Sequence, residues 1–599
     1  MKKLESYRKI LAGILIAFMI LFPFFSYFHV ARPDGMEMIY FAKKSKLVVD
    51  LFYFNKEVIL FAFALLLMAA MGIGFLVYWI LAEKLPGYLL KMKKLWIALG
   101  LYFLLNVLSC IFSEYREYGV MGLSIDYEGL AAIFGYMVLF IGGFFLFRDR
   151  WGQKLLIWGV RVLSLFLTIG AVAELVWGPA FNVKTIQRFF TPERYWHLLE
   201  NIYLDYNGNI SLTFGNPGFF GGFCSLLLGI LVASTLTGGF LGTRILDGIL
   251  AGGMLFDIFI SGSSGAFYAG AVTCLAEGIL LFRRKLWKNY LQAIGISLAF
   301  VMILLSGAGS LAQGKNLVEN VKDSVVNNQY EKDKNVFTVK KIQLNQGILS
   351  VQGQGGNFQV EVLKDGSDLT VDDFRFTDEN GKEILSEQGF KDGEARLSGA
   401  YEKISLTVMG RILSLDFGYQ DPVEFYVQDG LLYYVDFNGS LLSKIPQPVM
   451  TGLEQFYPLF TGRGYIWISS IPLLWDVVFL GKGIGTFPFY YPQSEVAGML
   501  NVHGSADYCI EQAHSWYLQT AISSGIISLI CMVYLFGWCF AKGIRDLIKK
   551  KELGGHLEYL FIFGLLAYEI VGLVNNSCIA ATPFFWLILG YTAGQSAKR

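Results

Sequence analysis

The stretch Ala513-His514-Ser515-Trp516-Tyr517-Leu518-Gln519 runs directly into an apolar segment that ends near Phe540. An apolar segment of about this length predicts a membrane span, so His514 lies at the mouth of a span and not in a soluble core. Histidine changes charge near neutral pH, and an interface gives it lipid on one side and water on the other. The stretch therefore indicates chemistry at a membrane surface, although a lone interfacial histidine is as often structural as functional.

The composition of the whole chain predicts that many more spans surround this one. Of the 599 residues, 54% are hydrophobic and only 16% are charged, and the mean hydropathy is +0.48. A soluble core cannot bury that much apolar surface, so we expect an α-helical polytopic membrane protein with about twelve transmembrane helices. The expected spans are 10–28, 58–81, 95–112, 130–147, 155–177, 217–236, 245–260, 265–282, 290–306, 515–540, 557–573 and 581–593. The formal net charge of +1 gives no indication of a nucleic-acid partner.

Basic residues in the loops predict the orientation of these spans. Lysine and arginine gather on the cytoplasmic side of membrane proteins. The basic clusters of this chain are Lys2-Lys3, Lys91-Lys93-Lys94, Arg148-Arg150-Lys154, Arg283-Arg284-Lys285 and Lys549-Lys550-Lys551. All of them fall on one side if the N-terminus is cytoplasmic, so both termini are expected to be cytoplasmic.

The segment 311–455 differs from the rest of the chain and is expected on the outer, extracytoplasmic side. The runs 358–362, 404–408 and 423–427 alternate apolar and polar residues, as half-buried strands do. Pairs such as Asp365-Gly366, Asn380-Gly381, Asp392-Gly393, Asp429-Gly430 and Asn438-Gly439 are typical of tight turns. We therefore expect an inserted all-β domain, a small sandwich or meander, which either contacts glycan or serves as a spacer.

This insertion divides the chain into four expected parts. Residues 1–310 form an N-terminal transmembrane bundle of about nine spans, and residues 311–455 form the β domain. Residues 456–514 form an outer loop with an interfacial helix, and residues 515–599 form about three C-terminal spans.

The outer loop 456–514 carries a second candidate group of residues. Thr461-Gly462-Arg463-Gly464-Tyr465-Ile466-Trp467 opens it, and Gly481-Lys482-Gly483-Ile484-Gly485 follows an apolar stretch. Arginine holds phosphate oxygens in a planar fork, so Arg463 is a candidate clamp for pyrophosphate, with lipid-headgroup contact as the equal alternative. The glycines permit exposed backbone amides that could approach an anion, but the loop lacks the sequence context of a nucleotide site.

Taken together, these motifs resemble the O-antigen ligase and O-antigen polymerase family, whose members transfer glycans carried on polyprenyl pyrophosphate. The resemblance rests on Arg463-Gly464-Tyr465-Ile466-Trp467, then Gly483-Ile484-Gly485-Thr486-Phe487, then His514 through Gln519, with further similarity at Phe214-Gly215-Asn216-Pro217 and from Ser113 to Gly129. It covers roughly residues 113–586 without the β domain, and it implies the architecture of C-superfamily glycosyltransferases in a bacterial cytoplasmic membrane.

The chain departs from the family pattern at two positions. Ser515 stands where the family has asparagine after the histidine, and Ser263-Ser264-Gly265 lacks the arginine of a Ser-Arg-Gly turn. If that arginine normally shares the pyrophosphate charge, then Arg188, Arg194 or Lys482 has to replace it, or the donor binds differently.

The resemblance implies a function and a set of site residues. A glycan on undecaprenyl pyrophosphate would be transferred to a hydroxyl of a glycan or lipid-anchored acceptor, without metal or other cofactor and with inversion at the anomeric carbon. His514 would act as general base and Arg463 would bind pyrophosphate. Substrate binding is assigned to Trp467, Gly483, Gly485, Tyr517, Gln519, Asn216 and Ser264. Ligase and polymerase are not distinguished.

Two other functions are compatible with parts of the sequence. A flippase or transporter of lipid-linked sugars would explain the number of spans and the carboxylates within them, of which Asp257 and Glu569 approach the outer face as candidates for an acceptor pocket. The two halves of the chain show no repeat of the kind that transporters carry. A sensor whose β domain binds cell-wall fragments would need a cytoplasmic output domain, and the sequence indicates none.

Overall fold

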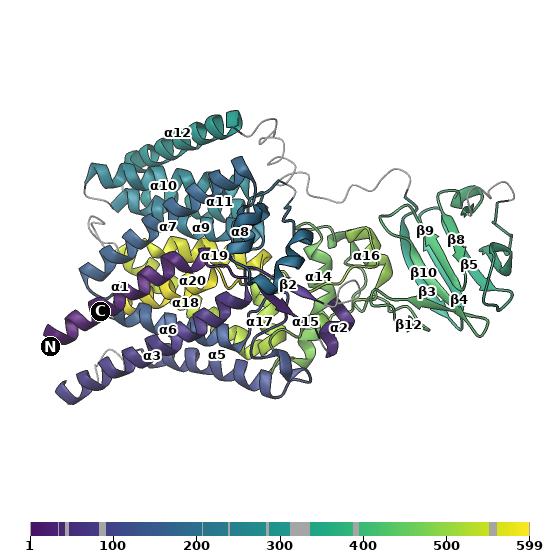
Figure 1. The fold of residues 1–599 in the computed structure, drawn as a ribbon, viewed down its shortest axis with the longest axis horizontal. Helices are drawn as coiled ribbons and strands as arrows, with labels where there is room; N and C mark the ends of the chain where they lie inside the picture. The colour runs from purple at the N-terminus through teal and green to yellow at the C-terminus, as the bar shows by residue number, and fades with distance from the viewer. Residues whose placement is uncertain are drawn as a thin grey trace.

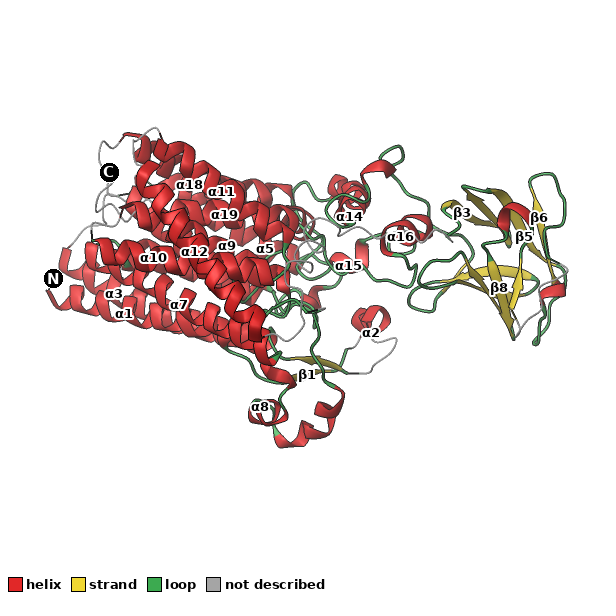
Figure 2. Ribbon diagram, turned by 90° about the horizontal axis from the view of Figure 1, so that it is seen from above, coloured by secondary structure: helices red, strands yellow, loops and turns green. Residues whose placement is uncertain are grey.

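The computed structural model describes residues 2–33, 35–41, 47–82, 92–206, 208–237, 240–282, 287–311, 336–386, 394–549 and 560–597. A bundle of long helices forms one end of the molecule, and β-sheets form the other (Figure 1). Short helices and loops lie between the two (Figure 2). Both chain termini lie at the end of the bundle that is farthest from the sheets (Figure 1).

The bundle has the character of a membrane domain. Its helices are α1 (Lys2–Leu21), α3 (Phe54–Ala82), α5 (Lys93–Ile111), α6 (Leu130–Leu146), α7 (Arg150–Trp177), α9 (Pro217–Thr237), α10 (Leu241–Ile260), α11 (Ser264–Phe282), α12 (Trp287–Leu311), α18 (Ile526–Lys549), α19 (Phe561–Val574) and α20 (Thr582–Ser596). In the described ranges, seven helices are long and apolar enough to cross a membrane. Every expected span overlaps one helix of the bundle.

The predicted span 515–540 is interrupted, which the hydropathy pattern did not predict. It consists of the short helix α17 (Trp516–Ser524) followed by α18, and Gly525 separates them with a φ of +99°. Glycine adopts positive φ values without steric cost, so the chain can change direction at this residue. The residues after His514 therefore belong to a short helix of their own.

The β region consists of two antiparallel sheets. One contains β3 (Val339–Asn345), β4 (Ile348–Gly353), β5 (Gly356–Val362) and β6 (Phe374–Asp378). The other contains β7 (Glu394–Arg396), β8 (Ser405–Met409), β9 (Ile412–Asp416), β10 (Val423–Gln428), β11 (Leu431–Val435) and β12 (Leu441–Leu442). Each sheet is a meander, and apolar side chains of both sheets form one core. We call this unit the β sandwich.

Turn residues specify the hairpins of the β sandwich. Asp429 and Gly430 join β10 to β11 with φ values of +53° and +73°, the conformation that a two-residue hairpin requires. The three alternating runs of the sequence fall on β5, β8 and β10. Asp392-Gly393 lies outside the described residues.

The layer between bundle and sandwich contains α14 (Arg463–Ser470), the 3₁₀ turn 471–476, α15 (Phe487–Tyr490) and α16 (Val496–His503). A small hairpin of β1 (His29–Ala31) and β2 (Val48–Asp50), with α2 (Gly35–Phe41) and α8 (Lys184–Phe189), lies beside it. Val496, Ala497 and Leu500 of α16 belong to the core of the β sandwich. The packing therefore crosses the expected domain boundary at residue 455.

Candidate functional site

A cavity of about 820 Å³ lies where several helices begin; we call it the arginine cavity. Pro217, Ser264 and Arg463, the first residues of α9, α11 and α14, all line it, and so does Ser515, which directly precedes α17. The N-terminus of a helix carries a partial positive charge and therefore attracts anions. Helix N-termini from four separate elements converge on this cavity.

One side of the arginine cavity is apolar. Tyr268 of α11, Leu529 of α18, and Ile570 and Leu573 of α19 contribute to its wall. Tyr268 and Leu573 are each more than half exposed. Apolar side chains exposed on a membrane domain face lipid tails, so the cavity can admit a lipid-linked molecule from the side.

Arg463 is the one charged residue among the described residues that line this cavity. Its Nη1 donates to the Thr461 hydroxyl at 3.0 Å and its Nη2 donates to the Asn575 side-chain oxygen at 3.2 Å. Its Nε is buried and has no hydrogen-bond partner in the described part of the chain. Burial lowers the pKa of the guanidinium, as expected for a charge without a carboxylate partner. Arg463 thus keeps an unused donor and an uncompensated charge.

The turn before Arg463 has an unusual backbone. Phe460, Thr461 and Gly462 have φ values of +52°, +60° and +86° in succession. Residues other than glycine rarely adopt this left-handed conformation, which costs about 1–2 kcal/mol for each of them. We call residues 460–462 the left-handed turn, and it directs α14 so that the first residue of the helix meets the cavity.

His514 is next to the arginine cavity, since its neighbour Ser515 lines it, although His514 itself does not. Two predicted residues hold the backbone just before it: Trp467 Nε1 donates to the Ala513 carbonyl at 3.1 Å, and the Ala513 amide donates to Gln519 Oε1 at 2.9 Å. His514 has a φ of +49°. Trp467 and Gln519 therefore position the histidine in a conformation that the chain would otherwise avoid.

The surroundings of His514 keep its imidazole neutral. Burial, the Arg463 charge and His503 together lower the pKa of His514 to about 4. A neutral imidazole at pH 7 can accept a proton. An anion bound next to Arg463 would cancel part of the positive charge and raise the pKa of His514, so the base would become stronger when the anion is in place.

The sequence did not single out His503 or Asn575. His503 ends α16, its Nε2 is buried without a partner in the described residues, and burial lowers its pKa to about 4. Asn575 follows α19. Its side-chain oxygen accepts from Arg463, and its backbone carbonyl accepts from the Trp516 amide at 2.9 Å. The polar run Asn575-Asn576-Ser577 lies between two apolar segments, and this contrast could have singled out Asn575 from the sequence.

The predicted residues Asn216, Ser264 and Tyr517 also line the arginine cavity. The Asn216 side chain caps α9 by accepting from the Gly218 amide at 2.7 Å. The Tyr517 hydroxyl donates to the Glu569 carbonyl at 2.9 Å, so it is engaged with α19. Together with Arg463 and Trp467, the structure brings five of the nine predicted site residues to one cavity.

Gly483 and Gly485 do not line the arginine cavity. The amides of Gly481, Lys482 and Gly483 donate to Ser109 Oγ at 3.0 Å, to the Ile522 carbonyl at 2.8 Å and to the Ser523 carbonyl at 3.0 Å. The last carbonyls of a helix lack partners within the helix, and this loop supplies them for α17. The glycine-rich loop therefore caps a helix.

The three cations considered as replacements for the missing arginine lie elsewhere. Arg188 stacks over Trp196 and Arg194 over Tyr195. The Lys482 ammonium is 3.6 Å from an Asp476 oxygen. None of the three lines the arginine cavity. The cavity is lined by Arg463 and by the starts of α9, α11 and α17, without a second cation among the described residues.

Asp257 and Glu569, the two carboxylates considered for an acceptor pocket, do not line the arginine cavity. One oxygen of Asp257 accepts from the Thr168 hydroxyl at 2.9 Å inside the bundle. Both carboxylates therefore belong to the helix packing around the site.

A polar network connects Asn576 and Ser577, which follow Asn575, to the loop before α6. The side-chain nitrogen of Asn576 donates to the Gln512 side-chain oxygen at 2.6 Å, and the Gln512 side-chain nitrogen donates to the Asp126 carboxylate at 3.0 Å. Ser577 donates to Glu128 at 2.7 Å. Burial raises the pKa of Asp126 to about 6 and that of Glu128 to about 7. This network holds the loop after α19 in place, and Asn575 in that loop accepts a hydrogen bond from Arg463.

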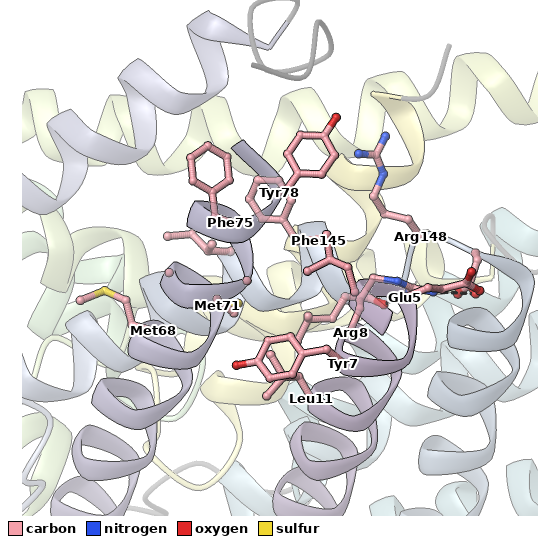
Figure 3. A pocket seen from close by; sticks show the side chains of 16 residues that line it. Glu5, Tyr7, Arg8, Leu11, Met68, Met71, Phe75, Tyr78, Phe145 and Arg148 are labelled. Atoms are coloured by element: carbon pink, nitrogen blue, oxygen red, sulfur yellow. Dashed lines mark hydrogen bonds and ion pairs between the residues drawn. The ribbon is translucent and has the colours of Figure 1, made fainter. Parts of the chain in front are cut away.

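A separate cavity of about 630 Å³ lies at the terminal end of the bundle, between α1, α3 and α6 (Figure 3). Apolar and aromatic side chains such as Met68, Phe75 and Phe145 surround it. Two cations, Arg8 and Arg148, and two carboxylates, Glu5 and Asp149, also line it, and Arg8 forms an ion pair of 2.7 Å with Asp149. No predicted site residue lines this cavity, and its charge is already compensated.

In the described part of the chain, no group of three or more histidine, cysteine, aspartate or glutamate residues is placed to hold a metal ion. No protein-family model matches the chain, and no curated protein matches it. Arg463 and His514, with the helix starts around them, are therefore the candidate functional groups of the chain.

Proposed function

We propose that this protein is a membrane glycosyltransferase of the O-antigen ligase or polymerase type. It would transfer a glycan from undecaprenyl pyrophosphate to an acceptor hydroxyl at the outer face of a bacterial cytoplasmic membrane, with both termini on the cytoplasmic side. The observation that carries this proposal is the arginine cavity. It combines an apolar, lipid-facing wall with one uncompensated cation and four helix starts.

The chemistry follows from these groups. The pyrophosphate would lie at Arg463 and the helix N-termini, with the polyprenyl chain along α11, α18 and α19. His514 would take the proton from the acceptor hydroxyl as its oxygen forms a bond to the anomeric carbon. The bond from that carbon to the pyrophosphate oxygen breaks, and undecaprenyl pyrophosphate leaves with the electron pair. Charge stabilisation and positioning account for large parts of such a rate enhancement.

The test uses purified protein in proteoliposomes supplied with lipid-linked oligosaccharide and acceptor. We expect the wild type to form product, and we expect Arg463→Ala and His514→Ala to leave the donor unconverted although it is present on the side of the β sandwich. Trp475→Ala is the matched control, because Trp475 is 79% exposed and does not line the cavity.

Two outcomes would overturn the proposal. Full product formation by both variants would show that the site is assigned wrongly. Movement of donor across the membrane by the wild type without product would instead identify the chain as a flippase of lipid-linked sugars.

A further inference from the structure

A cavity of about 860 Å³ lies where the β sandwich meets the layer of short helices; we call it the sandwich cavity. Lys340 of β3 lines one side, and Glu454, Tyr457 and Glu495 line the other. Thr461 lines both this cavity and the arginine cavity. The left-handed turn is therefore the wall that the two cavities share.

The walls of the sandwich cavity are fixed relative to each other. The side-chain nitrogen of Asn501 donates to the Val339 carbonyl at 2.6 Å, and its side-chain oxygen accepts from the Tyr419 hydroxyl at 2.8 Å. Val496 and Leu500 of the same helix are buried in the core of the β sandwich. The β sandwich is thus packed as one unit with the segment that ends in His503, and the cavity exists before any ligand binds.

The left-handed turn brings this cavity close to the proposed base. A Cβ atom on Gly462 would lie 3.5 Å from His503 Cε1, so His503 is packed against the turn. His503 in turn contributes to the low pKa of His514. Val502, next to His503 in the chain, lines the sandwich cavity, so a group held there near Thr461 is close to the segment that carries His503.

The side chains of the sandwich cavity suit a hydroxyl-rich ligand. Lys340 donates hydrogen bonds and Glu454 accepts them. The Thr461 hydroxyl donates to the Phe460 carbonyl at 2.6 Å and accepts from Arg463, which leaves it one lone pair to accept from a ligand hydroxyl. Lys340 and Glu454 are exposed, whereas Tyr457 presents a largely buried aromatic ring. A volume of this size is within the range of about 300–1,000 Å³ for ligand pockets and accommodates several sugar rings.

We propose that the sandwich cavity binds the acceptor saccharide and presents one of its hydroxyl groups across the left-handed turn to the donor at Arg463. This inference rests on the proposed function and assigns the β sandwich a role in it. The acceptor hydroxyl loses its proton to His514 as its oxygen bonds to the anomeric carbon, and the pyrophosphate lipid leaves.

The test compares Lys340→Ala/Glu454→Ala with Lys341→Ala in the full-length protein. Lys341 is also an exposed lysine of β3, but it does not line the cavity. We expect the double variant to raise the KM for the acceptor by about tenfold or more, the size expected for losing hydrogen bonds to charged groups. The KM for the donor should stay unchanged. Exposed side chains contribute little to folding, so both variants should retain the wild-type Tm.

A binding measurement separates this inference from the proposed function. Its probe is a set of soluble oligosaccharides released by mild acid from the surface polysaccharide of the producing cells. The wild type and Lys341→Ala should bind a saccharide of this set, and Thr338→Trp, which fills the cavity, should not. Binding without any transfer activity would overturn the proposed function alone. Failure of the wild type to bind, or an unchanged acceptor KM in both cavity variants, would overturn the inference.

Discussion

The left-handed turn before Arg463 and the glycine-rich loop 481–485 look alike in sequence, yet the structure uses them in opposite ways. In both, one cation stands between two glycines, Arg463 between Gly462 and Gly464, and Lys482 between Gly481 and Gly483. At Arg463 the cation lines an open cavity and keeps an unused donor. In the glycine-rich loop, the amides bind Ser109 and the carbonyls that end α17, and Lys482 lies near Asp476.

This difference shows what makes a loop able to bind an anion. The surroundings of the cation are what differ, since no carboxylate lines the arginine cavity whereas Lys482 lies near Asp476. The backbone amides of both loops have partners within the protein; those of Gly462, Arg463 and Gly464 donate to the carbonyls of Pro458, Phe460 and Leu459. The glycine-rich loop has such partners because α17 ends beside it and needs donors for its last carbonyls. The following experiments test whether the two loops really differ in this way.

The largest effect is expected from the two cations. Arg463→Lys keeps the charge but removes the planar fork, and we expect donor turnover to fall by about 30-fold or more, which corresponds to losing one or two charge-assisted hydrogen bonds. Lys482→Ala should change turnover by less than about threefold, because its charge is near Asp476 and away from the cavity. Equal losses in the two variants, measured as initial rates in proteoliposomes, would remove the distinction.

A methyl group in the glycine-rich loop should affect folding. The Cβ of Gly481→Ala would lie 2.2 Å from the backbone of Ser523, so the end of α17 would have to move. We expect a loss of roughly 2 kcal/mol of stability, the usual size for overpacking, and a lower Tm. Gly537→Ala in α18 is the control, because a Cβ there meets no neighbour and the residue has no positive φ. An unchanged Tm for Gly481→Ala, with loss of donor binding, would instead assign the loop to the substrate.

A smaller effect is expected from the residue that positions His514. Trp467→Phe removes the donor to the Ala513 carbonyl, and a neutral hydrogen bond contributes about 1 kcal/mol, so we expect kcat to fall by about fivefold. The KM for the donor should change less than kcat, because the ring still lines the cavity. Trp475→Phe should match the wild type. A change in donor KM alone would make Trp467 a binding residue and not a positioning residue.

The smallest effect concerns pH. His514 has a pKa of about 4 in the free protein, so kcat/KM should stay level from neutral pH downward and fall only as the pH approaches 4. Because Arg463 helps to lower this pKa, donor pyrophosphate should raise it, and the acid limb of kcat should lie at higher pH than that of kcat/KM. Arg463→Ala should raise the acid limb of its residual kcat/KM. If kcat and kcat/KM of the wild type and kcat/KM of Arg463→Ala all fell at the same acid pH, Arg463 would not influence the pKa of His514.

Much of the architecture could be predicted from local sequence patterns. Long apolar runs predicted the helices, and alternation with turn pairs such as Asp429-Gly430 predicted strands. The break at Gly525 was missed because hydropathy averages over a window and does not register one positive φ. The shared core of Val496 with the β sandwich was missed because it joins residues that are far apart in the chain.

The candidate site was predictable only in part for the same reason. Residue types and order singled out Arg463, Trp467 and His514. The roles of Asn575 and His503 depend on contacts between distant segments, and the use of the Gly483 amide depends on where α17 ends. Such long-range contacts have no local pattern in one sequence.

The central claim is that Arg463 and the helix N-termini around it bind a lipid-linked pyrophosphate. The most direct test measures binding of undecaprenyl pyrophosphate and of undecaprenol, which lacks phosphate, to the purified protein in nanodiscs. We predict that the wild type and Lys482→Ala prefer the pyrophosphate lipid by about 30-fold or more, the size expected from charge-assisted hydrogen bonds, and that Arg463→Ala loses this preference. Equal preference in the wild type and in Arg463→Ala would contradict the account.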